Sequence, residues 1–266
     1  MSGALYLDLD GTLLGRGASL FHDGEGKISL LGPRAIEACL RAEVEVVLMS
    51  GRRRAQVAEA ARLFGQGAFI FEAGCVLEID GEQLWMTELV AGESSVHAQI
   101  EASGAPALLL EHYAGQLEYH APWHRDREIS HLFRGTVNAA EADALLAENG
   151  HGNLRLVDNG GVHAPAEAQN WRVYHLIPAG GSKAAAVARH MRARGLRRED
   201  TFAAGDSRED LAVAGVVGTF WILANALERD PSMHAELTAH ANVRVTEASH
   251  GAGVYEAVIT TLAERR

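Results

Sequence analysis

An apolar run near the N-terminus leads directly into two aspartates. Residues 4–7 read Ala-Leu-Tyr-Leu, and Asp8 and Asp10 come next, before the turn formers Gly11 and Thr12. An uninterrupted apolar run is typical of a strand that is buried on both faces of a parallel sheet. Burying a carboxylate costs several kcal/mol unless a cation or hydrogen bonds compensate for the lost water. The segment therefore predicts a strand whose carboxyl end opens into a ligand crevice, which is where such sheets bind ligands.

The composition excludes several classes of protein. The 266 residues are 47% hydrophobic and 22% charged, as in ordinary globular proteins, and the length suggests two domains or one domain with a large insertion. The formal charge of -11 disfavours nucleic acid and anionic membranes as partners, so we expect an anionic ligand to be captured locally. Two cysteines within apolar stretches and the lack of a basic leader or a long apolar segment favour the cytoplasm.

Both ends of the chain alternate strand and helix patterns. Strand patterns occupy residues 44–49, 68–71, 201–204, 219–223 and 243–245, and helix patterns lie between and after them. This alternation is typical of a doubly wound, mostly parallel sheet. We therefore predict an α/β core formed by residues 1–82 and 179–266.

Residues 83–178 follow a different pattern. Candidate strands at residues 117–119, 129–133, 154–157 and 171–177 are separated by helix patterns at 94–101 and 140–148. Runs of strands with few crossovers favour an antiparallel sheet in an α+β layer. We predict that residues 83–178 form an inserted α+β domain.

Four polar clusters follow strands of the predicted α/β core. They are Asp8-Leu-Asp10-Gly-Thr12, Ser50-Gly51-Arg52, Lys183 after Gly180-Gly181-Ser182, and Asp206 with Asp210 after Gly205. In this order the clusters resemble the haloacid dehalogenase superfamily, whose phosphatases carry DxDGT, a Ser or Thr, a Lys and GDxxxD. An insertion between the second cluster and the lysine is similar to the Cof-type subfamily, also called IIB. The resemblance implies a Rossmann-like core covered by an inserted α/β cap.

The resemblance also implies a phosphoric monoester hydrolase and a role for each residue. Asp8 would attack phosphorus to form an aspartyl-phosphate, and Asp10 would protonate the leaving oxygen and then activate water. Mg²⁺ prefers about six oxygen ligands, which Asp8, the carbonyl of Asp10, Asp206 and waters would supply. Asp210 would support these ligands from behind. The phosphate would be bound by Thr12, Ser50, Gly51 and Lys183.

Two positions depart from the pattern of these relatives. Glu209 stands where relatives with large caps usually carry Asn, and Glu72-Ala73-Gly74 replaces the Asn-Gly that follows their third strand. Glu209 either adds a carboxylate near the metal or points away from it, and Arg208 could neutralise its charge. Both departures bear on the substrate more than on the type of reaction.

The inserted domain carries a dense polar stretch at residues 124–134. It contains Arg125, Arg127, His131 and Arg134, which together with Arg52 are our candidates for recognising the leaving group. Strand alternation could aim Arg127 and His131 in the same direction. Arg127-Glu128 before a strand, and the Trp-Arg-Val-Tyr-His of residues 171–175, are similar to mannosyl-3-phosphoglycerate phosphatases. A solvated sheet face with cross-strand ion pairs is the alternative interpretation of this stretch.

The sequence thus predicts a Mg²⁺-dependent phosphatase acting on a small phosphorylated metabolite. Its resemblances favour a sugar phosphate or a glycosyl-phosphoglycerate as the substrate. A sugar phosphomutase of the phosphomannomutase type would use the same aspartyl-phosphate, and a binding or regulatory protein on an inactive scaffold is the alternative from another class. The sequence holds no signal of the oligomeric state.

Overall fold

The apolar N-terminal run forms strand β1 (Gly3–Asp8), and all six of its residues are buried. The computed structural model describes residues 3–161 and 171–265. Strand β1 pairs in parallel with β2 (Val44–Met49) on one side and with β10 (Thr201–Gly205) on the other. Strand β1 is therefore an interior strand, and Asp8 lies at its carboxyl end with Asp10 just beyond it.

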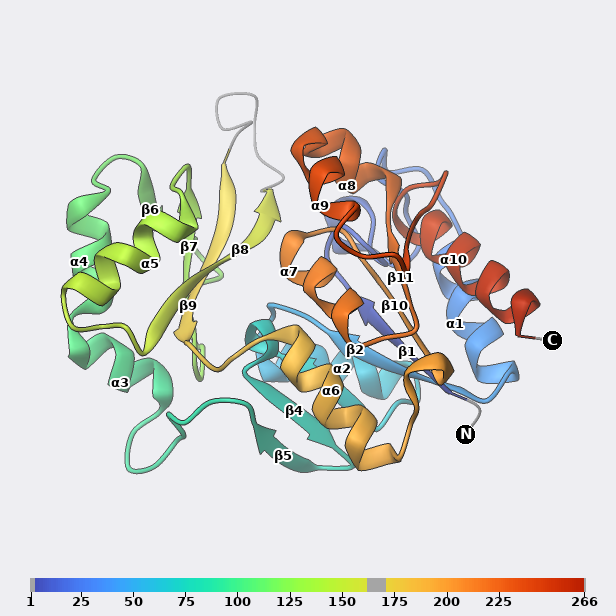
Figure 1. Cartoon of the computed structure of the whole chain (residues 1–266), viewed down its shortest axis with the longest axis horizontal. Coiled ribbons are helices and arrows are strands. Elements are labelled where there is room, and N and C mark those ends of the chain that lie inside the picture. Colours follow the sequence, from blue (N-terminus) through green and yellow to red (C-terminus); the bar gives the residue numbers. More distant parts are fainter. Residues whose placement is uncertain (1–2, 162–170, 266) are drawn as a thin grey trace.

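The sheet that contains β1 has eight strands in the order β12-β11-β10-β1-β2-β3-β4-β5 (Figure 1). The remaining members are β3 (Ala68–Phe71), β4 (Val76–Ile79), β5 (Glu82–Trp85), β11 (Thr219–Ile222) and β12 (Val243–Val245). All neighbours from β12 to β3 are parallel, and β3-β4 and β4-β5 are antiparallel. The prediction of a doubly wound, mostly parallel sheet is confirmed.

Helices cover both faces of this sheet. On the face of Leu5 and Leu7 pack α1 (Leu31–Arg41), α2 (Arg54–Leu63) and α10 (His250–Glu264). On the face of Tyr6 pack α6 (Lys183–Arg194), α7 (Arg208–Leu211) and α8 (Ala224–Arg229), with α9 (His234–Leu237) nearby in sequence. Alternation along β1 sends neighbouring side chains to opposite faces, which explains why the run has no polar position.

A second sheet lies beside the first (Figure 1). It is antiparallel, in the order β6 (Leu117–Tyr119), β7 (His131–Gly135), β9 (Arg172–Pro178) and β8 (Leu154–Gly161). Helices α3 (Val96–Ser103), α4 (Ala105–His112) and α5 (Ala139–Glu148) accompany it. The predicted elements of residues 83–178 occur within a few residues of their expected places, and α4 was not predicted. The large sheet runs on to Trp85, three residues beyond residue 82, where the first core segment was expected to end.

In the described parts of the chain, short 3-10 helices occur at η1 (Arg16–Ala18), η2 (Glu72–Gly74), η4 (Arg198–Asp200), η5 (Ala212–Gly215) and η6 (Pro231–Met233). Within the ranges the structure describes, no helix combines the length and the apolar character needed to cross a membrane.

A glycine makes the turn after β1 possible. Gly11 has a φ of +81°, which side chains on L residues rarely adopt, and a Cβ atom at this position would collide with the carboxylate of Asp206. The close approach brings the turn after β1 directly against the end of β10. Polar groups from two neighbouring strands therefore meet at the carboxyl edge of the sheet.

Helix α10 is tied to the sheet by a buried hydrogen bond, which gives a test of the packing. The indole N–H of Trp221 donates to Oγ1 of Thr261 over 3.0 Å. Thr261→Val keeps the shape but leaves the indole donor unsatisfied, so we expect the free energy of unfolding to fall by about 1 to 3 kcal/mol. Urea unfolding followed by tryptophan fluorescence measures this change. Thr260→Val, one residue earlier and partly exposed, is the matched control, and an equal loss in both variants would contradict the assignment.

Candidate functional site

A buried ammonium group joins two of the predicted site residues. Lys183 begins α6 and has no exposed surface, and its Nζ lies 2.7 Å from Oδ1 of Asp8 and 2.6 Å from Oδ1 of Asp210. Burial alone would lower the pKa of Lys183, but the carboxylates of Asp210 and Asp8 outweigh it and raise the pKa above its usual value. Lys183 therefore stays charged, and it links β1 to the segment after β10.

Three aspartates gather around this contact. One carboxylate oxygen from each of Asp8, Asp206 and Asp210 lies within 4.8 Å of the others, and all three residues are buried. Burial raises the pKa of Asp8 well above its usual range, and the charges of Asp210 and Asp206 add to the rise while Lys183 opposes it. Carboxylate oxygens in such a cluster are the ligands that Mg²⁺ prefers, so these residues fit a divalent cation.

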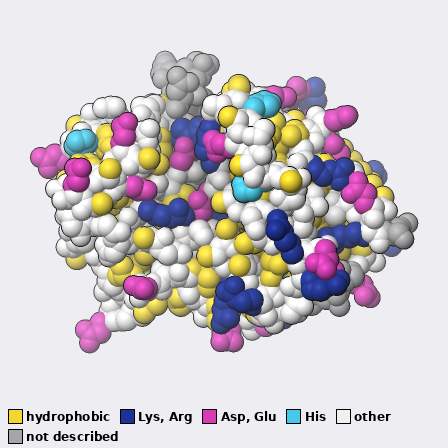
Figure 2. Space-filling view, viewed as in Figure 1, with side chains coloured by type: hydrophobic (Ala, Val, Ile, Leu, Met, Phe, Trp, Pro, Cys, Tyr) yellow, Lys and Arg dark blue, Asp and Glu magenta, His cyan; other side chains and the backbone are white. Residues whose placement is uncertain are grey.

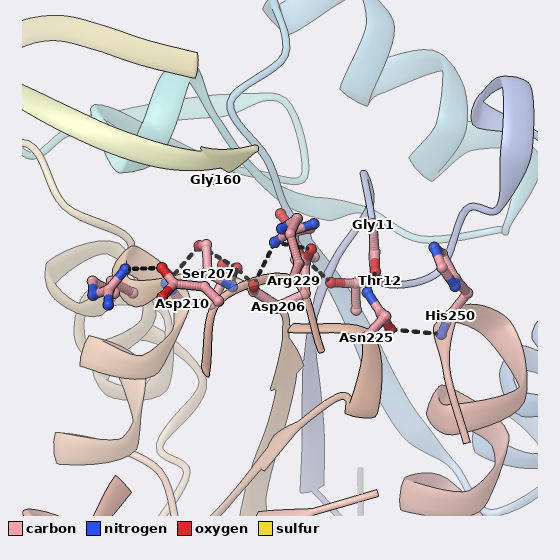
Figure 3. Close-up of polar contacts among 12 residues, drawn as sticks. Gly11, Thr12, Gly160, Asp206, Ser207, Asp210, Asn225, Arg229 and His250 are labelled. Carbon is pink, nitrogen blue, oxygen red and sulfur yellow. Dashed lines mark hydrogen bonds and ion pairs between the residues drawn. The ribbon is translucent and has the colours of Figure 1, made fainter. Parts of the chain in front are cut away.

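Asp206 is held by donors from two distant parts of the chain (Figure 3). The hydroxyl of Thr12 donates to its Oδ1 over 3.0 Å, and Nη2 of Arg229 donates to its Oδ2 over 2.9 Å. The same Nη2 also donates to the backbone carbonyl of Asp206. Burial raises the pKa of Asp206, and Arg229 opposes that shift. Thr12 was predicted to bind phosphate, and in the structure its hydroxyl donates to Asp206.

Asp210 is positioned by a capping box at the start of α7. Its Oδ2 accepts hydrogen bonds from the backbone N–H and the hydroxyl of Ser207, at 3.1 and 2.6 Å, while the Ser207 hydroxyl caps the backbone N–H of Asp210. Its other oxygen is left to face Lys183. A local sequence pattern therefore orients this carboxylate before any ligand binds.

Glu209 pairs with Arg155, which the sequence did not predict. Nη2 of Arg155, on β8 of the second sheet, lies 3.1 Å from its Oε1, and the backbone N–H of Lys183 lies 3.3 Å from the same oxygen. The expectation that Arg208 would neutralise Glu209 is wrong, because Arg208 turns outward to Asp230 and Glu236. Neighbouring residues on a helix point about 100° apart, so Arg208 and Glu209 leave α7 in different directions.

The second predicted aspartate, Asp10, is engaged by an arginine. Nε and Nη2 of Arg52 donate to its two carboxylate oxygens, at 2.7 and 2.5 Å, and about half of the Asp10 side chain is exposed. The backbone N–H of Arg52 donates to the hydroxyl of Ser50, which is buried. The carbonyl of Gly51 accepts from Nη1 of Arg127 over 3.0 Å. The Ser50-Gly51-Arg52 loop thus contacts both Asp10 and Arg127 of the inserted region.

A cavity of about 460 Å³ opens beside these groups, between the two sheets. Its walls from the large sheet and its loops include Asp10, Gly11, Gly51, Arg52, Asp206 and Arg229, and its walls from residues 117–175 include His120, Trp123, Arg127, Asn159 and His175. On the face shown in Figure 2, basic and acidic side chains lie together along the boundary between the two parts of the molecule. Burial lowers the pKa of His175 well below its usual value, and Arg127 and Lys183 add to this, so the imidazole is neutral.

The predicted recognition residues of the insertion lie at different places. Arg127 lines the cavity, as does Arg52, and it also borders a second hollow, which Arg125, His131 and Tyr119 line as well. His131 stacks on His97 at 3.8 Å, and burial lowers its pKa to about 4. Arg134 pairs with Glu118 on the neighbouring strand β6. Arg127 and His131 border the same hollow, although β7 begins at His131 and Arg127 precedes it.

Several residues near the site were missed in the sequence. They are His120, Asn159, Asn225 and Arg229, whereas Glu72 stands out in the sequence as a departure but has no role assigned to it there. Asn225 follows β11 as the aspartates follow β1 and β10, and its amide donates to the carbonyl of Gly11 over 2.8 Å (Figure 3), so the rule of polar residues at strand ends would have found it. That rule does not reach His120, Arg229 and Asn159, because they come from a loop, from helix α8 and from the interior of β8.

Comparisons with known proteins agree with this architecture. No family model matches the chain. It is 28% identical over 261 residues to the phosphoglycolate phosphatase of Archaeoglobus fulgidus, covering 96% of this chain and 95% of that protein. The sucrose-phosphatase of Synechocystis, solved with sucrose and phosphate, has a TM-score of 0.64 at 15% identity over 98% of each chain. A haloacid dehalogenase-like hydrolase from Bacillus subtilis has a TM-score of 0.61 at 18% identity, over 97% of this chain and 99% of that one.

The solved structures share the fold of this chain. The large parallel sheet and the inserted antiparallel sheet are the fold that the chain has in common with the haloacid dehalogenase-like hydrolase. The relative of 28% identity is a phosphatase.

Replacing the buried lysine tests the electrostatics of the site. Lys183→Met leaves Asp8 and Asp210 buried without their cation, and we expect a loss of about 3 to 5 kcal/mol in the free energy of unfolding at about pH 7. The pKa of Asp8 is already raised in the folded state and rises further in the variant, so the folded protein binds more protons than the unfolded chain. The stability of the variant therefore recovers as the pH falls, and the loss should be smaller at about pH 5.

Urea unfolding at both pH values measures this difference. Lys27→Met is the matched control, because Lys27 is exposed and pairs only locally with Glu25. A loss for Lys183→Met that is the same at both pH values would contradict the assignment.

Proposed function

We propose that the protein is a Mg²⁺-dependent phosphomonoesterase that works through an aspartyl-phosphate on Asp8. The observation that carries the proposal is the convergence of Lys183 and three aspartates at the carboxyl end of β1 and β10. Nζ of Lys183 holds Oδ1 of Asp8, which orients the carboxylate from one side. A fixed carboxylate next to a cation is the arrangement that a nucleophile for phosphoryl transfer requires.

The reaction would proceed in two displacements. An oxygen of Asp8 forms a bond to phosphorus while the bond from phosphorus to the ester oxygen breaks, and Asp10 gives its proton to that leaving oxygen. Asp10 then takes a proton from water, the water oxygen attacks phosphorus, and phosphate leaves Asp8. Arg52 holds Asp10 and lines the same cavity, so an anionic substrate that attracts the guanidinium would release Asp10 for proton transfer.

Asp8 and Asp206 would hold Mg²⁺, with the backbone carbonyl of Asp10 nearby in sequence, and Asp210 of the same cluster would support them. The ion would offset the negative charge of the phosphoryl group. Thr12 and Arg229 fix the carboxylate of Asp206, and the capping box fixes that of Asp210. The ligand oxygens are thus held in place by neighbouring protein groups.

The substrate that we propose is a small phosphomonoester, either a sugar phosphate or a glycosyl-phosphoglycerate. The cavity of about 460 Å³ has the size of sites for small molecules. Two relatives are named for phosphoglycolate and for sucrose phosphate hydrolysis, which supports a compact and polar leaving group. The net charge of -11 supports a metabolite rather than nucleic acid or a membrane as the partner, and two buried free cysteines support a cytoplasmic location.

The nucleophile can be tested by an isosteric change. Asp8→Asn removes the attacking oxygen, and we expect kcat to fall by about 10³-fold or more. Phosphate release is measured over a panel of sugar phosphates, phosphoglycolate and glycosyl-phosphoglycerates. Asp200→Asn is the control, because Asp200 lies just before β10, at the opposite end of that strand. Unchanged release by Asp8→Asn would refute the mechanism, and an isomerised sugar phosphate in place of free phosphate would identify a mutase.

The metal assignment can be tested by binding as well as by activity. We expect EDTA to abolish phosphate release and Mg²⁺ to restore it. Calorimetric titration of the metal-free protein should show Mg²⁺ binding, and Asp206→Asn should weaken that binding by about tenfold or more, because a neutral amide oxygen replaces a carboxylate. Asp80→Asn, which alters an exposed aspartate paired with Arg194, should bind Mg²⁺ as the wild type does. Full activity in EDTA would contradict the assignment.

A further inference from the structure

A buried glutamate occupies a strained turn at the carboxyl end of β3. Glu72 has no exposed surface, and it and Ala73 have φ values of +44° and +58°, which cost about 1 to 2 kcal/mol for each non-glycine residue. The backbone N–H of Glu72 donates to the carbonyl of Arg52, and that of Ala73 donates to the carbonyl of Ser50. The strained turn is therefore bonded to the loop that borders the cavity.

The side chain of Glu72 crosses to the inserted region. Its Oε1 accepts the backbone N–H of Glu128 over 2.8 Å, and its Oε2 accepts the backbone N–H and the hydroxyl of Ser130, at 2.6 and 2.7 Å. Nη1 of Arg127 lies 3.7 Å from Oε2. An ionised carboxylate has only acceptor sites, which matches three donors converging on it. These contacts offset the cost of burying its charge.

The segment held by Glu72 forms one wall of the cavity. Arg127 donates from Nη1 to the hydroxyl of Ser130 over 2.9 Å and to the carbonyl of Gly51 over 3.0 Å. Nδ1 of His175 lies 3.2 Å from the same hydroxyl. A Cβ atom at Gly51 would come within 2.6 Å of Nε2 of His175, so this wall sits directly against the loop. Two cavity residues thus depend on a hydroxyl group that Glu72 orients.

We propose that Glu72 is a positioning residue that fixes Arg127 and His175 against the Ser50-Gly51-Arg52 loop and so sets the shape of the substrate cavity. Glu72 does not line the cavity and would act through Ser130 and the backbone of residues 128–130. The strain at Glu72 and Ala73 supports this role, because strained backbone persists where the surrounding contacts determine it. The link to catalysis rests on the proposed function, whereas the link between the two sheets does not.

The test compares Glu72→Gln with wild type in two measurements. A glutamine amide brings donors toward the N–H groups of Glu128 and Ser130, so at least one hydrogen bond is lost. We expect peptides containing residues 128–130 to exchange their amide hydrogens about tenfold faster or more, with unchanged exchange in β1. We also expect KM to rise by about tenfold or more while Mg²⁺ binding stays at the wild-type value.

Glu78→Gln is the matched control, since Glu78 is another buried glutamate but pairs with Arg54 and does not line the cavity. Ser130→Ala keeps Glu72 and removes the hydroxyl shared with His175, so it should raise KM in the same direction and serves if Glu72→Gln does not fold. Unchanged exchange at residues 128–130 in Glu72→Gln would overturn the proposal, as would faster exchange with unchanged KM. If the wild type hydrolyses no ester of the panel, the exchange measurement still tests the link while the proposed function fails.

Discussion

The site depends on the contact between the ammonium group of Lys183 and two buried carboxylates. Three buried carboxylates at the end of two adjacent strands would repel one another and would lose hydration without compensation. Lys183 contacts two of them within 2.7 Å, and Arg229 contacts the third. A cation in the first turn of a helix opposes the helix dipole, but this penalty of about 0.3 to 1 kcal/mol is small beside two close charged hydrogen bonds. The placement of Lys183 follows from its partners rather than from its own helix.

The sequence predicted the parts of the fold and site that local rules govern. Asp8 and Asp206 lie at the carboxyl ends of the parallel strands β1 and β10, and such ends meet at one edge of a sheet, so their proximity could be expected from the sequence. Lys183 instead follows β9 of the antiparallel sheet, and only the resemblance to known phosphatases predicted that it joins them. Contacts between the two sheets could not be expected, because they depend on how the sheets pack. Arg155 and Glu209 are 54 residues apart, Arg155 on β8 of the second sheet and Glu209 on α7, which packs on the large sheet.

Charge in the cavity is balanced internally even though the whole chain is acidic. Arg52 is paired with Asp10, Arg229 with Asp206, and Arg127 with the carbonyl of Gly51 beside Glu72. To bind these arginines, an anionic ligand must displace the groups that they already contact. Part of its binding energy is thereby used to separate Arg52 from Asp10, the side chain that the proposed reaction needs free. This exchange favours ligands with strong negative charge over neutral ligands of the same shape.

The two positions that depart from the pattern of related phosphatases have one structural property in common. Glu72 and Glu209 are both on the large sheet's side of the molecule, both are largely buried, and both accept hydrogen bonds from the inserted region. Glu72 accepts hydrogen bonds from residues 128–130, and Glu209 accepts one from Arg155. The residues assigned to phosphoryl transfer keep the family pattern, whereas the departures lie where the two sheets meet. Because the cavity is formed between those sheets, changes at this boundary alter the shape offered to the leaving group without altering the groups that would act on phosphorus.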